Sequence, residues 1–275
     1  MTTKSKKKTG TRSTQPVPEL QPPPSASPKS RVSVLLPVLN GLTRHAPGSL
    51  ERTLTTVLNQ PSVDVEVIAV NNGSTDQTSD YLHQWSERDA RVICIDLEHN
   101  RGIAEAMNQA GERATGDFCM YSTARNWYEP DSLIYLARAL VEHPLPVGFT
   151  SGCMQVSGQM NRYHVPPPFD FTTYTREFVA NMYMFRREAF ALGCRYVDYL
   201  TIPDATVPGG MRVGRHDADF CMQLLCNLKW ISYPVRDHLI VHYDYTGGAG
   251  HLSAILGPYR SQLEVAFRAR WGQYL

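Results

Sequence analysis

The chain has 275 residues, with 27 lysine and arginine residues against 26 acidic ones, and 42% of its residues are hydrophobic. This length allows one sizeable core or two small domains, and the apolar fraction excludes wholesale disorder and the collagen-like and mini-protein classes. No run of about 18 apolar residues occurs, so we expect no membrane-spanning helix. The opening MTTKSKKKTG has no apolar stretch behind its charges, which argues against a secretory signal.

Residues 1–30 differ from the rest of the chain in charge and proline content. They hold six basic residues against Glu19 alone, a net charge of +5, so the remainder carries −4 because the whole chain carries +1. Six of the 19 prolines also lie here. We expect a disordered Lys/Pro-rich arm that either contacts an acidic partner or keeps the chain in solution. The remainder is not a nucleic-acid binder by charge alone.

The six cysteines form no CxxC pair, and most of them lie inside apolar runs such as VICI and DFCMY. A cysteine in such a run behaves as a small hydrophobic residue. This use of cysteine indicates a reducing compartment, and we therefore expect a cytoplasmic protein.

In the first half of the chain, four apolar runs alternate with three amphipathic segments. The segment that begins at Ser49, the expected helix cap, places its leucines and Val57 on one helical stripe. The expected strands cover 31–38, 63–70, 91–97 and 117–122, and the expected helices cover 49–60, the stretch from the turn at 71–76 to about 87, and 103–114. This alternation predicts an α/β fold with a parallel, doubly wound sheet. The loops 38–48, 71–76, 98–102 and 122–129 should then converge on one site at the carboxyl ends of the strands.

The second half is less regular. A strand running into a helix is expected over 181–193, and a helix over 218–230. Two short strands, ISYPV (231–235) and LIVHY (239–243), are expected to follow, and the chain should close with a helix over 258–272. Residues 154–176 and 194–214 are expected to be mostly loop.

The turn NNGSTD (71–76) is the most informative polar segment. No GxGxxG or GxxxxGK[ST] motif is present, so a dinucleotide cofactor or a phosphate-cradling loop is not indicated. The amides of Asn71 and Asn72 suit the edge of a nucleobase, since each offers both donors and an acceptor. The same segment also fits an Asx-type turn with a helix cap built from Gly73, Ser74 and Asp76. Spacing alone favours this turn over nucleobase recognition.

Five segments in order resemble the family 2 glycosyltransferases of the GT-A fold. They are RVSVLLPVLN, VIAVNNGSTDQTSDYL, NRGIAEAMNQAGERATGDFCMYSTARNWYEPDSL, NMYMFRREAFALGCRYVD and HDADFCMQLL. The resemblance covers about residues 31–271. It implies a single GT-A domain over 31–275, a doubly wound, mostly parallel sheet flanked by helices, with a nucleotide-binding half at 31–127 and an acceptor-binding half at 128–275.

The resemblance also implies an activity and a set of residues. The activity is transfer of a sugar from a nucleotide-sugar donor, most simply a UDP-sugar, to an acceptor hydroxyl with inversion. Asp217 would be the general base, although it could instead complement the dipole of its helix, as Asp219 could. His216 would contact the acceptor. The donor would be bound by Pro37, Leu39, Asn71, Asn72, Asp76, Arg101, Arg125, Asn126 and His242. Apart from the resemblance, the aromatic face of Trp127 suits a sugar ring or the acceptor, although it could equally fill the edge of the core.

One departure from the family concerns the metal. The family places acidic residues at the end of the fourth strand to bind Mn²⁺ or Mg²⁺, whereas this chain reads Ser-Thr-Ala-Arg-Asn over 122–126. Alanine and arginine supply no oxygen ligand to such an ion. Either Arg125 replaces the ion at the donor diphosphate and no cofactor is required, or the site has decayed and the protein binds nucleotide sugars without catalysis. A site rebuilt from His216, Asp217 and His242 is a weaker alternative. A third possibility is a transferase that reaches nucleic acid through the basic arm.

Overall fold

The computed structural model describes residues 30–158, 162–164, 183–203, 210–245 and 256–274. The expected arm, apart from Ser30, lies outside these residues. The first half confirms the predicted alternation, and its boundaries differ from the expected ones by only a few residues. Its elements are β1 (Arg31–Val38), α1 (Ser49–Leu58), β2 (Asp64–Asn72), α2 (Thr78–Arg88), β3 (Val92–Leu97), α3 (Ile103–Arg113) and β4 (Phe118–Tyr121).

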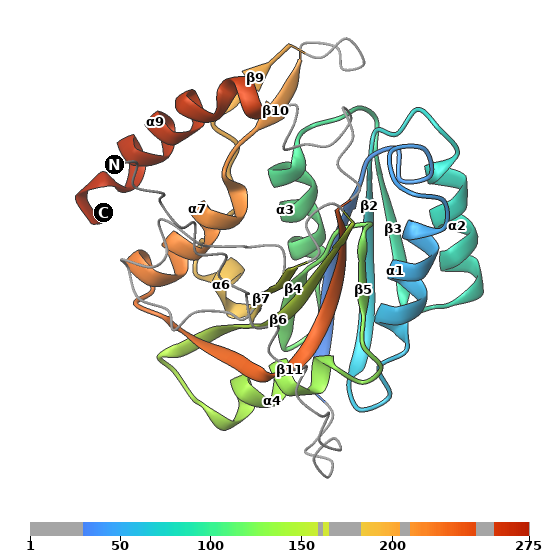
Figure 1. Ribbon diagram of the computed structural model, residues 1–275, viewed down its shortest axis with the longest axis horizontal. Coiled ribbons are helices and arrows are strands. Elements are labelled where there is room, and N and C mark those ends of the chain that lie inside the picture. Colours follow the sequence, from blue (N-terminus) through green and yellow to red (C-terminus); the bar gives the residue numbers. More distant parts are fainter. Residues whose placement is uncertain (1–29, 159–161, 165–182, 204–209, 246–255, 275) are drawn as a thin grey trace, which may run out of the picture.

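These four strands are parallel and lie side by side in the order β3-β2-β1-β4. Their carboxyl ends therefore meet at one edge of the sheet, as the loop positions predicted. Figure 1 shows α1 and α2 on one side of these strands and α3 on the other. The runs of valine, leucine and isoleucine form buried strands because both faces of the sheet are covered by helices.

The second half extends the same sheet with mixed directions. β8 (Met184–Arg186) is antiparallel to β4, and the order then continues through β6 (Val147–Gly158), β11 (Ile231–Tyr245) and β5 (Asn126–Tyr128). Two expectations were wrong here. The segment expected to be loop from residue 154 continues β6, and the two short strands expected at 231–243 are one long strand whose pairing with β6 is interrupted by bulges. A β-bulge changes the direction of a strand without ending it. The sequence after Pro234 therefore resembles the end of a strand, although β11 continues.

The remaining elements flank this sheet. A short strand, β7 (Arg162–His164), pairs with β6, and β9 (Leu200–Ile202) and β10 (Met211–Val213) form a separate antiparallel pair. The expected helix at 218–230 begins earlier and ends earlier: α7 (His216–Met222) continues as a π-helix, Gln223–Asn227. The other helices are α4 (Leu133–Glu142), α6 (Glu188–Ala191) and α9 (Arg260–Trp271), with 3₁₀ turns at Gly257–Tyr259 and Gly272–Tyr274.

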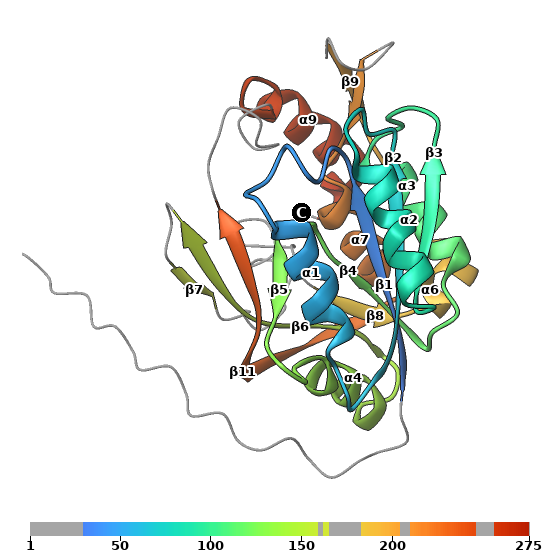
Figure 2. The ribbon, with the colours of Figure 1, turned by 90° about the vertical axis from the view of Figure 1, so that its right-hand side faces the viewer.

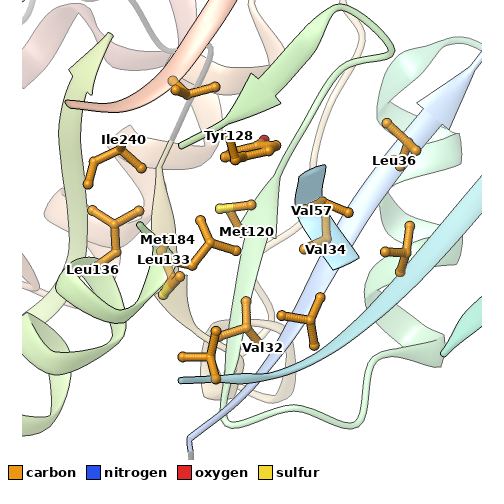
Figure 3. Packing of buried hydrophobic residues seen from close by; sticks show 14 of the residues in the cluster. Val32, Val34, Leu36, Val57, Met120, Tyr128, Leu133, Leu136, Met184 and Ile240 are labelled. Atoms are coloured by element: carbon orange, nitrogen blue, oxygen red, sulfur yellow. The ribbon is translucent and has the colours of Figure 1, made fainter. Parts of the chain in front are cut away.

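Two hydrophobic clusters hold this single domain together, one on each face of the sheet. On one face, side chains of β1, β4, α1 and α4 pack together, as Figure 3 shows for Val34, Met120, Val57 and Leu136. On the other face, α3, α7 and α9 pack against the opposite residues of the same strands. Figure 2 shows α4 and α9 at opposite ends of the molecule. The alternation of β1 residues between the two clusters is the period-2 pattern of a strand.

The expected cap of α1 was wrong in detail. The helix begins at Ser49 itself, and the N-cap position is taken by Gly48, whose φ is +78°. Glycine adopts this left-handed backbone without steric cost. The Ser49 side chain makes no capping hydrogen bond, and Thr53 instead donates to the Ser49 carbonyl oxygen at 3.0 Å.

Candidate functional site

The two asparagines after β2 tie neighbouring loops together. Asn71 donates from Nδ2 to Asp96 Oδ1 at 2.7 Å and accepts at Oδ1 from the Ser74 amide at 3.1 Å. Asn72 accepts the Arg101 amide at 2.9 Å and donates to Asn100 Oδ1 and the Gly102 carbonyl oxygen, both at 3.1 Å. Asn71 thus closes a local turn on Ser74, whereas Asn72 bridges to the loop before α3. Contact of these amides with a nucleobase remains a prediction.

Asp76 links the start of α2 to the loop after β1. It accepts hydrogen bonds from the Thr78 amide at 3.0 Å and from the Thr43 hydroxyl at 2.9 Å. Burial acts to raise the pKa of Asp76, but these hydrogen bonds outweigh it and leave the pKa lowered. The carboxylate therefore ties the first residue of α2 to the loop after β1, and its contact with a donor stays a prediction.

The end of β1 lies beside this turn. Pro37 and Leu39 are partly buried, and the next residue, Asn40, accepts the Thr75 amide at 2.7 Å and donates its own amide to Ser74 Oγ at 2.9 Å. The predicted base-flanking residues of β1 and β2 are thus held next to one another by Asn40.

Arg101 lies at the mouth of a cavity of about 450 Å³. Asn72 holds its backbone, while the residue as a whole is exposed. The cavity lies between the loop after β3 and the β9–β10 pair, and it is lined by His99, Asn100, Arg101, Glu105, Thr201, Gly210 and Arg212. A guanidinium in this position can meet a phosphate or a base, which is the role that the sequence predicted.

Arg125 does not extend into bulk solvent. It is partly buried, its Nη2 donates to the Tyr243 hydroxyl at 2.6 Å, and its guanidinium carbon lies 4.9 Å from the Tyr243 ring centroid. Tyr243 comes from β11, whereas Arg125 follows β4. The contact therefore fixes the cation over the carboxyl end of the parallel strands.

Tyr121, the last residue of β4, connects Arg125 to α7. Its phenol is buried, and burial raises its pKa well above the usual value. The charge of Asp217 raises this pKa further, and the charge of Arg125 lowers it. The ring of His216 stands edge-on to Tyr121, with ring centroids 6.4 Å apart. The structure thus brings Arg125, His216 and Asp217 to one tyrosine.

The two aspartates at the start of α7 have different environments. The Asp219 side chain is 0% exposed and accepts hydrogen bonds from Gln223 and Trp271, both at 2.7 Å, and from Tyr199. The Asp217 side chain is 21% exposed, and its Oδ1 lies 2.7 Å from Nε2 of His216. Asp219 therefore fastens α9 to α7, which leaves Asp217 as the acid available for chemistry.

Trp127 and His242 lie on the other face of the sheet from Tyr243. They are cross-strand partners on β5 and β11, and their rings stack with centroids 5.1 Å apart. Because side chains alternate along a strand, His242 and Tyr243 point to opposite faces. His242 Nε2 also pairs with Glu129. The structure therefore does not bring these two residues together with Arg125, and their predicted ligand contacts remain predictions.

The segment after β4 does not fit a divalent ion. Ser122 Oγ accepts the Tyr128 hydroxyl at 2.7 Å, and Asn126, which is fully buried, accepts Thr123 Oγ1 at 3.0 Å. With Arg125 between them, the segment offers a cation and no carboxylate. Hard cations such as Mn²⁺ and Mg²⁺ need oxygen ligands that carry or share negative charge.

A rebuilt metal site from His216, Asp217 and His242 is not formed among the described residues. Only one group of three nitrogen, sulfur or carboxylate side chains there comes within metal-binding distance, namely His83, Cys94 and Asp96. That group lies at α2 and β3, which β2 and β1 separate from β4 in the sheet.

Sequence reasoning missed Tyr121, Tyr243 and Asp198. The oxygens of Asp198 are buried without a hydrogen-bond partner behind His216. Tyr121 could have been found from its place at the end of a predicted strand. Tyr243 and Asp198 carried no signal, because only the long β11 and the segment before β9 bring them to this region.

Comparison with known proteins places the chain among glycosyltransferases. The "Glycosyl transferase family 2" model matches residues 33–199. Glycosyltransferase GlyA of Streptococcus pneumoniae serotype 4 is 27% identical over 113 residues, which are 41% of this chain and 15% of that protein. The poly-beta-1,6-N-acetyl-D-glucosamine synthase of Staphylococcus aureus is 31% identical over 96 residues, which are 35% of this chain and 23% of that enzyme. The matched part thus spans well under half the length of these relatives.

Two solved structures share the fold. Mannosyltransferase PcManGT from Pyrobaculum calidifontis, in complex with GDP-Man and Mn²⁺, aligns with a TM-score of 0.62 at 19% identity over 92% of this chain and 68% of that one. TarS 1-349 from S. aureus, in complex with UDP-GlcNAc, aligns with a TM-score of 0.60 at 16% identity over 79% of this chain and 59% of that one. The GT-A fold and the family expected from the five sequence segments are both confirmed: the chain belongs to glycosyl transferase family 2.

Proposed function

We propose that this protein transfers a sugar from a UDP-sugar to an acceptor hydroxyl with inversion and without a divalent ion. Family membership supports the reaction class. Among the fold neighbours, one structure contains UDP-GlcNAc and another contains GDP-Man, which supports a nucleotide-sugar donor. The choice of UDP follows from the family resemblance of the first half.

One observation carries the proposal: Arg125 follows the carboxyl end of β4, and there the ring of Tyr121 stands edge-on to His216, which pairs with Asp217 at 2.7 Å. A transferase of this kind needs a cation for the leaving diphosphate and a base for the incoming hydroxyl in one place. The two side chains come from distant parts of the sequence, and the fold brings both to the edge where ligands of parallel sheets bind.

The proposed step is a single displacement. The acceptor oxygen attacks the anomeric carbon, its proton passes to the Asp217 carboxylate, and the bond from that carbon to the diphosphate oxygen breaks, so that UDP leaves with the electron pair. Asp217 Oδ1 is buried against His216, which leaves Oδ2 to accept the proton.

Arg125 would stabilise the charge that develops on UDP. Among the described residues, Arg125 donates to Tyr243 from Nη2, and its other N–H groups would make a bidentate contact with phosphate oxygens. A guanidinium carries half the charge of Mn²⁺. At equal distance and dielectric its Coulomb attraction to the diphosphate is therefore about half as strong, and slower chemistry than in a metal-dependent relative is expected.

The test is a transfer assay in EDTA. UDP- and GDP-linked sugars are offered with a panel of glycan and polyol acceptors, nucleotide release is followed, and the anomeric configuration of the product is read by NMR. We expect turnover with a UDP-sugar, an inverted product, and loss of turnover in Asp217→Asn but not in Asp237→Asn, an exposed control. A retained configuration, or full activity in Asp217→Asn, would refute the mechanism.

The carboxylate-free segment at 122–126 favours a second candidate, a protein that binds nucleotide sugars without transferring them. That candidate predicts UDP binding without turnover on any acceptor, and it predicts no measurable effect of Asp217→Asn on binding.

A further inference from the structure

A group of buried polar atoms without hydrogen-bond partners lies behind Asp217. Both carboxylate oxygens of Asp198 and Nδ1 of His216 are buried without a hydrogen bond of good geometry among the described residues, and the buried Oδ1 of Asp217 faces Nε2 of His216 at 2.7 Å. An unsatisfied buried polar atom costs about 1–3 kcal/mol, and such atoms are rare in folded proteins. Three such atoms beside one candidate base indicate a function rather than an accident of packing.

The backbone makes room for the Asp198 carboxylate. A Cβ atom at Gly102, where φ is +91°, would lie 2.3 Å from Asp198 Oδ2, and one at Gly214 would lie 2.9 Å from the Asp198 Cα and 3.3 Å from Oδ1. Any larger residue at either position would displace the acid. Gly102, just before α3, and Gly214, two residues before His216, thus leave room for the buried Asp198 carboxylate.

The charges around His216 come from both carboxylates. Burial acts to lower its pKa, but Asp217, at 2.7 Å, and then Asp198 act in the other direction and leave the pKa raised. Tyr121, which stands edge-on to the imidazole, is neutral. Around Asp198, burial raises the pKa, His216, Arg212 and the backbone amide of Ala104 lower it, and Glu105 raises it. His216 is therefore a residue on whose pKa both carboxylates act.

We infer that Asp198 is a positioning residue that keeps His216 protonated, so that the imidazolium holds Oδ1 of Asp217 and presents Oδ2 to the acceptor hydroxyl. This inference rests on the proposed function, because it assigns Asp217 as the base. Asp198 acts through its field, since neither of its oxygens hydrogen-bonds to the ring. It does not touch the reacting atoms.

The test reads His216 directly and needs no turnover. The ring signals of the histidines are titrated by NMR in the full chain, and the His216 signal is assigned from its loss in His216→Gln. In Asp198→Asn the midpoint of the His216 titration should fall by about one pH unit, because one of its two neighbouring carboxylates is gone. The matched control, Asp237→Asn, should move His238, on whose pKa Asp237 acts, and not His216.

A stability measurement separates this role from a structural one. The raised pKa of Asp198 means that the fold disfavours its charged form. At pH values above that pKa, removing the charge therefore relieves a cost. Asp198→Asn should keep or raise the melting temperature at pH 7. A clear fall, together with an unmoved His216 titration, would mean that Asp198 is a packing residue and would overturn the inference.

The transfer assay supplies the remaining readout. In Asp198→Asn the fall of kcat on the alkaline side of its pH profile should begin at lower pH, in step with the His216 titration. The affinity for UDP should stay unchanged. A uniform fall in rate with no movement of the alkaline side of the profile would contradict a positioning role. The two proposals fail separately: an unmoved His216 titration overturns this inference even where transfer occurs, whereas absence of transfer by the wild-type protein overturns the proposed function whatever His216 does.

Discussion

Replacing each of the two aspartates of α7 by asparagine should separate catalysis from folding. Asp217→Asn removes the proposed base from a partly exposed position, so it should abolish transfer and cost less stability than the loss of Asp219. Asp219→Asn removes a fully buried charge that accepts hydrogen bonds from Tyr199, Gln223 and Trp271. The amide cannot accept all of these, because its nitrogen would face donors.

The size of the Asp219 effect follows from its burial. Breaking a buried, hydrogen-bonded charge by removing one partner costs about 3–5 kcal/mol. Arg270 contributes little of this, since its side chain is 43% exposed and its ion pair is screened by solvent. For a domain of this size, each kcal/mol lowers the melting temperature by about 2–4 °C, so a fall of roughly 10 °C is expected.

The assay combines thermal unfolding with limited proteolysis at the α9 end. In Asp219→Asn we expect the lower melting temperature and faster cleavage within 256–274, because Trp271 and Arg270 lose their anchor on α7. Asp217→Asn should melt at a higher temperature than Asp219→Asn, because the Asp217 side chain is 21% exposed whereas that of Asp219 is 0% exposed. If Asp217→Asn were the destabilised variant and Asp219→Asn the inactive but stable one, the assignment of the two acids would be reversed.

Three further changes test other parts of the structure. Burial acts to raise the pKa of Glu66, but hydrogen bonds from Ser33 and Thr115 leave it lowered. Its charge therefore stabilises the fold above the ordinary glutamate range and this contribution is lost as pH falls, so urea titrations should show Glu66→Gln weaker at pH 7 and nearly equal to the wild type at pH 3. Gly73→Ala, at φ +70° and with its new Cβ 2.3 Å from the His99 carbonyl carbon, should cost at least about 1 kcal/mol in the same assay. Trp127→Ala should leave UDP affinity by calorimetry unchanged, since Trp127 lies on the opposite sheet face from Tyr243; a marked loss would place the donor there.

The elements that the sequence predicted well are those whose pattern is local. The run 31–38 became β1 with the same bounds, and the helix expected at 103–114 became α3 at Ile103–Arg113, because a buried parallel strand and an amphipathic helix each carry their own period. The pattern failed where tertiary pairing decides the structure. The three-residue β5 has no period to read, and β11 is a single strand only because β6 pairs along most of its length.

The candidate site was predicted in the same uneven way. The absence of carboxylates after β4 and the presence of Asp217 could be read directly from the sequence. That Asp219 rather than Asp217 is anchored in the core depends on Trp271, 52 residues after Asp219 in the chain. The separation of His242 from Arg125 could not be predicted, since the register of β11 on β5 decides which face of the sheet His242 takes. Asp198 became visible only through burial and the two glycines around it.

The proposed mechanism requires that the Arg125 guanidinium binds the donor diphosphate in place of a divalent ion. The direct measurement is calorimetric titration of the full chain with UDP, once with excess Mn²⁺ and once with EDTA, in the wild type and in Arg125→Gln. Arg52→Gln, whose guanidinium lies 4.7 Å from the Trp127 ring centroid, is the control. We expect the same UDP affinity with Mn²⁺ and with EDTA, and a loss of about 30-fold in Arg125→Gln, the equivalent of one charged hydrogen-bond contact of about 2 kcal/mol. Binding that disappears in EDTA, or that is unchanged in Arg125→Gln, would contradict the claim.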